Sequence, residues 1–467
     1  MKRLSLHDGS MDMTKGSIFP KIIRFTIPLL IMGTLQLLYN AADIVVVGRW
    51  GSDASLAAVS STGALINLIV NVFMGLSVGT SVVVARHYGA GSSKDVSETV
   101  HTSIAVAIVC GIVVGILGVI TARNILELMD SPENVIGLSS LYVRIYFAGM
   151  PFNMLYNFGA AVLRAVGDTK RPLYYLTVSG IINVVLNLVF VIVFSMDVAG
   201  VALATIISQA VSAVLIVISL MHSDGPIRLE IKKIRIHKDK LLNIISVGLP
   251  AGIQGSIFSV SNVIIQSSIN FFGDAAMAGS GAGANIEGFV YMAMNSVYQA
   301  AITFTSQNYG ARSYKRIKVI ALECMGIVTA IGLSMGLLFM QFDTQLLSIY
   351  TDKSEEIAFG IVRMSVILYT YFLCGMMDTM VGLLRGIGHS VLPTIVTIAC
   401  VCGFRILWIY TYFASYKQSV GFDPENSLTV LFLSYPISWG LAAIVHTVLF
   451  VIMFGKILKK AKAEGAC

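Results

Sequence analysis

The chain is poor in charged residues, with only 32 basic and 25 acidic side chains among 467 residues, or 12%. A soluble domain carries about 25% charged residues, because charge keeps its surface hydrated. With 56% hydrophobic residues and a mean hydropathy of +0.81, this chain could not cover a soluble surface of its size. The composition therefore excludes soluble cytoplasmic enzymes, disordered proteins and nucleic-acid binders, so no nucleic-acid partner is expected.

Cysteine is also scarce, with six residues in the chain. Five lie in apolar stretches and Cys467 lies in the basic tail, so none is placed for a disulfide outside the cell. Cys400 and Cys402 have the short spacing of a metal-binding pair, but no nearby histidine or further cysteine completes a site. We therefore interpret the pair as small packing residues and expect no metal there.

Motifs of hydrolysis and nucleotide binding are missing as well. The chain has no G-x-x-x-x-G-K-[ST] loop, no H-E-x-x-H helix and no G-x-S-x-G elbow. The string GSGAG at 279–283 resembles a nucleotide loop, but no strand precedes it, and such small residues favour close helix packing. We therefore expect a protein that is not an enzyme and that uses no cofactor.

Long apolar runs, in contrast, are abundant. A helix needs about 20 mainly apolar residues to cross a bilayer, and twelve stretches of the chain qualify. None alternates in polarity like a barrel strand, and a helix satisfies its own backbone hydrogen bonds in lipid. The sequence therefore predicts an all-α integral membrane protein with twelve transmembrane helices. The predicted spans are residues 22–47, 56–80, 97–121, 136–160, 172–196, 199–221, 242–271, 277–305, 317–341, 357–383, 393–415 and 427–455.

Basic residues predict the orientation of these spans, because lysine and arginine are enriched in cytoplasmic loops. With the N-terminus inside, 25 of the 32 basic residues fall in inner segments, among them Lys2 and Arg3. The outer loops hold only four, which are Arg49, Arg123, Lys353 and Lys417. We therefore expect both termini in the cytoplasm, and the basic charge needs no nucleic acid to explain it.

Three landmarks recur at one spacing along the chain. The string LRAVG at 163–167 recurs as LRGIG at 384–388, and YGA at 88–90 recurs at 309–311, both 221 residues later. A shift of 222 carries Ile27-Pro28 onto Leu249-Pro250. This duplication predicts two six-helix repeats, an N-lobe of residues 1–221 and a C-lobe of residues 242–467, joined by a cytoplasmic linker of residues 222–241.

The even number of spans in each half makes the two repeats parallel, related by an axis along the membrane normal. Transporters built in this way hold a central cavity between their halves, and rocking of the halves exposes the cavity to each side in turn. The duplication therefore favours a secondary transporter over a channel or an intramembrane enzyme.

In this setting the chain resembles the multidrug and toxic compound extrusion (MATE) transporters, and among them the bacterial DinF-like group. The similarity covers about residues 20–455. The motifs that carry it are Tyr39-Asn40-x-x-Asp43 running into Gly48-Arg49-x-Gly51, Arg86-His87-Tyr88-Gly89-Ala90-Gly91, Leu163-Arg164-x-x-Gly167-Asp168, Asn183-x-x-x-Asn187, and Gly200-Val201-Ala202-Leu203-Ala204-Thr205.

The resemblance implies efflux of organic, often cationic, compounds in exchange for H⁺ or Na⁺. Small organic substrates and the lipid bilayer are then the expected partners, and we expect a monomer in a bacterial cytoplasmic membrane. Two alternatives stay open, a flippase for lipid-linked precursors in the related superfamily and a dedicated exporter of one endogenous metabolite. A flippase usually has more spans and a strongly cationic cavity, whereas here only Arg405 is clearly intramembrane.

Polar side chains inside the spans are few, and ionisable ones are candidate functional groups. In the N-lobe, Asn183 and Asn187 lie one turn apart on one helix face. At about 1.5 Å of rise per residue, Asp43, Asn187 and Thr205 fall at a similar depth in the outer half of the membrane. One carboxylate with amide and hydroxyl oxygens makes a cation site, either for Na⁺ at Asp43 or for a proton.

The resemblance adds a role for these residues, because similar MATE proteins couple cations through an aspartate in span one and an Asn/Asp pair in span five. Where the family has a second aspartate this chain has Asn187, which leaves Asp43 as the main titrating group and the coupling ion open. A local cap is the alternative for Asp43. Interhelical packing is the alternative for Asn183, Asn187 and Thr205.

The C-lobe does not repeat this set, since the shift of 221 replaces the acid and both amides by Ile264, Phe404 and Trp408. Its own candidate residues are Gln254, Glu287, Asp378 and Arg405. One interpretation is that they line the substrate cavity, with Glu287 against a cationic substrate. The other is a buried ion pair of Arg405 with Asp378 or with Glu287, since a lone buried arginine is costly.

Proline inside a span can bend the helix, and Pro28 and Pro151 lie in spans one and four. A bend at Pro28 would move Asp43 relative to span five, which makes Pro28 a candidate hinge. A fixed kink is the alternative.

Overall fold

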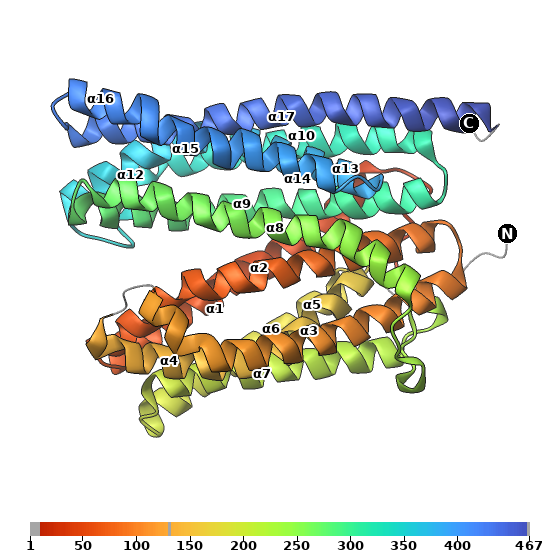
Figure 1. The fold of residues 1–467 in the computed structure, drawn as a ribbon, viewed down its shortest axis with the longest axis horizontal. Helices are drawn as coiled ribbons and strands as arrows, with labels where there is room; N and C mark the ends of the chain where they lie inside the picture. The colour runs from red at the N-terminus through yellow and green to blue at the C-terminus, as the bar shows by residue number, and fades with distance from the viewer. Residues whose placement is uncertain (1–9, 129–131, 465–467) are drawn as a thin grey trace. The chain divides into compact units, whose positions relative to one another are not determined.

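A computed structural model describes residues 10–128 and 132–464. Lys2, Arg3 and Cys467 lie outside these residues. Every regular element in the described part of the chain is a helix, and most are the long coiled ribbons of Figure 1. The predicted all-α fold is confirmed.

The first six predicted spans correspond to helices that mostly run past the predicted ends, because polar residues continue each helix beyond its apolar stretch. Span four is a pair of helices, and span five ends in a π-helical turn. The elements are α1 (Phe19–Trp50), α2 (Asp53–Gly89), α3 (Ser93–Leu128), α4 (Glu133–Ala148), α5 (Met150–Ala165), α6 (Lys170–Leu188), η1 (Val189–Val193) and α7 (Asp197–Met221).

The second six spans follow a linker that contains two short 3₁₀ turns, η2 (Gly225–Ile227) and η3 (Ile231–Lys233). Span ten is a helix pair and span eleven alternates between α-helical and π-helical turns. The elements are α8 (Lys238–Asn270), α9 (Asp274–Gly310), α10 (Tyr314–Gln341), α11 (Asp343–Leu347), α12 (Ser354–Ile367), η4 (Leu368–Thr370), α13 (Phe372–Gly386), α14 (Val391–Thr397), η5 (Ile398–Gly403), α15 (Phe404–Trp408), η6 (Ile409–Phe413), α16 (Ala414–Ser419) and α17 (Pro424–Ala463).

Length and hydropathy identify nine membrane-crossing segments in the described residues, and eleven when two bent helix pairs each count as one span. α9 is the twelfth span, since it is 37 residues long and lies where the sequence predicts one. Its many glycine, alanine and serine residues lower its hydropathy, which suits a helix that packs against other helices more than against lipid. The twelve-helix architecture is confirmed.

Two spans bend at repeat-related places. The angle between α4 and α5 is 47°, and Pro151 stands at the start of α5. Proline lacks the N–H that would continue the hydrogen-bond ladder, so the predicted kink in span four is confirmed. Span ten also bends by 47°, between η4 and α13. A 3₁₀ turn makes this second break without a proline, which is why the sequence pattern does not reveal it.

The helices pack as two compact units. One holds Met1–Met13 and Ile27–Ile253, and the other holds Thr14–Thr26 and Gln254–Cys467. The chain therefore changes unit inside α1 beside Pro28, and inside α8 close to the repeat-related Pro250. The linker 222–241 belongs to the first unit. The predicted lobes 1–221 and 242–467 follow the duplication in the sequence, and as domains they stay a prediction.

Each unit has its own core. In the first unit α5 packs against α2, α3 and α7, around buried side chains that include Phe147, Met154 and Phe158. The second unit is organised around α9, which packs against α10, α12 and α13, while α17 covers α12 and α13. In Figure 1 the long helices α9 and α10, which pack against each other, run alongside one another.

α9 approaches the backbone of α12 closely at Gly279, in the glycine-rich string 279–283. A Cβ atom on Gly279 would lie 2.1 Å from the backbone oxygen of Glu356 and 2.9 Å from the backbone nitrogen of Gly360. Backbone atoms cannot move aside without separating the helices, so this position requires glycine. The string lies within one helix, which supports its interpretation as packing residues.

We expect Gly279→Ala to lower the thermal unfolding midpoint of the detergent-purified protein, because overpacking a close contact costs about 1–3 kcal/mol. Gly281→Ala is the matched control, since a Cβ on Gly281 meets no atom within 4 Å. The midpoints are measured with a thiol-reactive dye or by tryptophan fluorescence. Equal midpoints for the two variants would contradict the close packing of α9 on α12.

Candidate functional site

The four side chains predicted to couple cations lie in one hydrogen-bonded chain within the first unit. Asn187 Nδ2 donates to Asp43 Oδ1 and, at 3.3 Å, to Asn183 Oδ1. Asn183 Nδ2 donates in turn to Thr205 Oγ1 at 3.4 Å. The chain links α1, α6 and α7, so the structure brings Asp43, Asn183, Asn187 and Thr205 together. Their role in coupling stays a prediction.

The centre of this cluster is on α6. Asn183 and Asn187 are 5% and 0% exposed, and their spacing of four residues places them on one face of the helix. The π-helical turn η1 begins two residues after Asn187, and such turns are frequent at functional sites. Thr205 Oγ1 donates to Val201 O at 2.9 Å, so its oxygen is left to accept from Asn183.

One atom of the cluster lacks a partner. Asn187 Oδ1 is buried and has no hydrogen-bond donor among the described residues, since the Nδ2 group makes both contacts of this amide. A buried acceptor without a donor costs about 1–3 kcal/mol. A bound cation or an O–H group on Asp43 would satisfy it. The oxygens present, from one carboxylate, amides and a hydroxyl, are ligands that hard cations prefer.

Two tyrosines of α4, Tyr142 and Tyr146, lie near Asp43 and were not among the predicted residues. The negative charge of Asp43 acts on both Tyr142 and Tyr146, and Tyr146 shares a hydrogen bond with Gln209 of α7. About 100 residues separate α4 from Asp43 in the sequence, and tyrosine is common in the spans. No sequence signal therefore singles these two phenols out.

The predicted hinge residue Pro28 lies within α1, which is unbroken from Phe19 to Trp50. Proline removes one backbone hydrogen bond from the helix interior, which weakens α1 at this turn. The chain passes from one compact unit to the other at Thr26 and Ile27, directly before Pro28. A hinge role is compatible with this position, and it stays a prediction.

The buried ion pair of the second unit differs from the expected ones. Glu287 of α9 pairs with Arg363 of α12, whose Nε and Nη2 atoms each donate to one carboxylate oxygen at 2.8 Å. Arg363 Nη1 also donates to Ser280 at 3.2 Å. The expected pairing of Arg405 with Glu287 is therefore wrong. The reason is the packing of α9 against α12, which no spacing along the chain reveals.

Arg405 has aromatic rather than acidic neighbours. Its guanidinium carbon lies 4.0 Å from the centre of the Tyr435 ring and 5.5 Å from that of Trp439, both on α17. Its Nε atom donates to Ser438 at 3.1 Å. The expected pair with Asp378 is therefore wrong as well, because cation–π contacts stabilise this buried charge in place of an acid.

Gln254 holds another arginine in place. Its Oε1 atom accepts from Arg385 Nη2 at 2.9 Å and from Thr394 at 3.3 Å, while Tyr298 also contacts Arg385. Arg385 is the arginine of the repeated LRGIG string, so Gln254 anchors the end of span ten. Asp378 lies two turns earlier on α13 and interacts electrostatically with Arg385. Among the described residues, no ion pair within 4.0 Å involves Asp378.

The sequence model of the MatE family matches the chain twice, at residues 28–189 and 250–411. The two matches are 222 residues apart, which agrees within one residue with the spacing of 221 to 222 between the repeated landmarks. The duplication is confirmed.

The chain is 28% identical over 400 residues to "Probable multidrug resistance protein YoeA" of Bacillus subtilis (strain 168). The aligned residues cover 84% of this chain and 86% of the relative. It is 21% identical over 384 residues to "Multidrug export protein MepA" of Staphylococcus saprophyticus, and the alignment covers 82% of this chain and 85% of that relative. A solved structure described as "Outward-facing conformation of a multidrug resistance MATE family transporter of the MOP superfamily" has a TM-score of 0.88 at 22% identity. The superposition covers 97% of this chain and 100% of the chain in that structure, and it shows a shared fold.

We expect Glu287→Leu to lower the thermal midpoint strongly, because removing one partner of a buried ion pair costs about 3–5 kcal/mol. Glu287→Leu/Arg363→Met is expected to recover most of this loss, since replacing both charges by apolar groups is often neutral.

Glu127→Gln serves as the control for this pair of variants, because it breaks the exposed pair of Arg123 and Glu127 and should have little effect. A double variant as unstable as Glu287→Leu would show that the two side chains do not compensate each other.

Proposed function

The chain belongs to the MATE family of membrane transporters, and from this premise we propose that it exports organic compounds by antiport, in exchange for H⁺ or Na⁺. The family consists of transporters and not of enzymes. Relatives named as multidrug resistance and multidrug export proteins support organic, drug-like substrates for this chain. Its placement in the DinF-like group stays a prediction.

The observation that carries the proposal is the hydrogen bond between Asn187 and Asp43. An ionised Asp43 accepts from the Asn187 amide, which is the arrangement in the structure. A neutral Asp43 would instead carry an O–H, and Asn187 Oδ1 would accept it after rotation of the amide. A bound Na⁺ would draw on the same oxygens. Either cation therefore rearranges the contact between α1 and α6, which links ion binding to the position of α1.

This link gives alternating access a physical cause. Pro28 weakens α1 at the turn where the chain enters the first unit, and Asp43 lies on the same helix toward its end. Gain or loss of the cation changes the free energy with which α1 is held against α6. The two states of the transporter differ in that contact, so the ion gradient biases their populations.

A cationic substrate needs an acidic partner that is not already neutralised. Glu287 is bound on both oxygens by Arg363, so it is a poor candidate for substrate contact. Asp378 has no such partner within 4.0 Å in the described part of the chain, and Tyr291 lies within reach of its charge. We therefore assign contact with a cationic substrate to Asp378 in place of Glu287.

We expect efflux of a fluorescent organic cation from proteoliposomes to follow either an imposed pH gradient or an imposed Na⁺ gradient, and the effective gradient identifies the coupling ion. Asp43→Asn keeps the shape of the side chain but removes its charge and its titrating proton. It is expected to lower gradient-driven transport by about tenfold or more.

Asp352→Asn, in an exposed loop, is the control for the same change of side chain and should transport like the wild type. Undiminished transport by Asp43→Asn would contradict the assignment of the site. Failure of both gradients to drive the wild-type protein with a panel of organic cations would contradict antiport itself.

We also propose that both termini and the linker face the cytoplasm of a bacterial cell. In a cysteine-free background, Asp352→Cys is expected to react with a membrane-impermeant maleimide added to whole cells. Lys315→Cys, which is also exposed, is expected to react only after the cells are opened. The opposite labelling pattern would show that the basic segments face outward.

A further inference from the structure

The linker between α7 and α8 is docked on α3 rather than free. Ile227 and Leu229 are each 2% exposed and belong to the apolar cluster that contains Val96 and Val100 of α3. Burial of these two side chains holds the first part of the linker against the start of the helix. The linker is therefore an ordered surface of the first unit.

Backbone hydrogen bonds hold the rest of the linker. The Glu230 N–H donates to His101 Nε2 at 3.0 Å, while His101 Nδ1 lies 2.7 Å from the Ser97 carbonyl oxygen. Since Nε2 accepts and Nδ1 donates, this arrangement assigns a neutral imidazole to His101. The His237 N–H donates to Thr102 Oγ1 at 3.1 Å. Any binding site between the linker and α3 is therefore already formed before a ligand binds.

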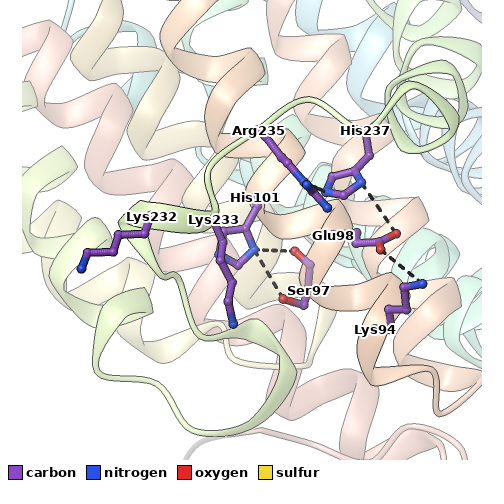
Figure 2. A pocket seen from close by; sticks show the side chains of 8 residues that line it. All are labelled: Lys94, Ser97, Glu98, His101, Lys232, Lys233, Arg235 and His237. Atoms are coloured by element: carbon purple, nitrogen blue, oxygen red, sulfur yellow. Dashed lines mark hydrogen bonds and ion pairs between the residues drawn. The ribbon is translucent and has the colours of Figure 1, made fainter.

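Such a site exists as a pocket of about 390 Å³ between the linker and the first turns of α3 (Figure 2). Four of its lining side chains are cations and one is an acid. Arg235 Nε donates to His237 Nε2 at 3.0 Å, so His237 is neutral like His101 and the lining carries a net charge of about +3. The lining residues are Lys94, Ser97, Glu98, His101, Lys232, Lys233, Arg235 and His237.

Nearby acids balance only part of this charge. Lys233 Nζ lies 2.7 Å from Glu230, and this hydrogen bond lowers the pKa of Glu230, so the acid stays ionised beside it. Lys232 and Arg235 have no acidic partner within 4.0 Å among the described residues, and Figure 2 shows Arg235 directed toward the His237 ring. The pocket therefore favours an anion.

Exposed apolar side chains alternate with these cations along the linker. Ile231 is 62% exposed and Ile236 is 48% exposed. The linker joins the ends of two membrane spans, so it lies at the level of the lipid headgroups. Apolar side chains at that level insert between lipids, while lysine and arginine reach the phosphates. A free anion would leave both isoleucines without a partner.

We propose that this pocket binds the phosphate of an anionic phospholipid headgroup, with Lys232 and Arg235 as its main ligands and Ile231 and Ile236 against the lipid chains. Arginine can donate to two phosphate oxygens at once, and lysine adds a point charge. The bound lipid fastens the linker to the bilayer. This lipid site is independent of the transport function, so a binding measurement alone tests it.

The test is lipid retention by the detergent-purified full chain, measured by native mass spectrometry after equal addition of phosphatidylglycerol and phosphatidylcholine. The wild type is expected to retain phosphatidylglycerol preferentially. Lys232→Gln/Arg235→Gln removes two exposed charges and is expected to lower this retention about tenfold. Lys315→Gln/Lys318→Gln removes the same charge from the repeat-related start of α10 and is expected to leave it unchanged. Equal retention by the two double variants overturns the proposal.

A second arm distinguishes a lipid from a free anion. Ile231→Ser/Ile236→Ser keeps every cation of the pocket and is expected to lower phosphatidylglycerol retention. Inorganic phosphate is titrated in parallel, with the thermal midpoint as readout. Stabilisation by phosphate that is lost in Lys232→Gln/Arg235→Gln, together with unchanged lipid retention, overturns the lipid assignment. Lipid-free midpoints equal to that of the wild type show that the variants are folded.

Discussion

A charged side chain inside a bilayer has no water around it, so the protein must supply the groups that stabilise it. Three charged side chains within the spans show three solutions. The Asn187 amide donates a hydrogen bond to Asp43, Arg363 forms a bidentate ion pair with Glu287, and the Tyr435 ring stacks against Arg405. The same requirement confines most other charges to loops and helix ends. Topology and candidate function therefore follow from one constraint.

The two halves share a scaffold and differ in chemistry. Both match the same family model, and both bend by 47° in the fourth span of the half. Among the described residues, the carboxylate and amide cluster occurs only in the first half, whereas the second half buries three arginines, Arg363, Arg385 and Arg405. Backbone architecture tolerates such divergence because it rests on helix length and close packing. A polar site depends on single side chains.

Most of the fold could be predicted from the sequence, because apolar length determines where a helix can cross lipid. Even α9, whose small residues reduce its hydropathy, lies where the sequence predicts a span. The bend of span ten could not be predicted, since no proline marks it and a single 3₁₀ turn produces it. The docking of the linker was equally hidden, because His101 and Glu230 are distant in sequence.

The sequence by itself determined the spans, the duplication and the common depth of Asp43, Asn187 and Thr205. Depth is readable because the rise per residue of a helix is constant. Only the tertiary structure decided which partner each buried group has, such as Arg363 for Glu287 and Tyr435 for Arg405. The face that a helix turns toward its neighbour depends on the packing of many side chains from distant segments, and no local pattern encodes that sum.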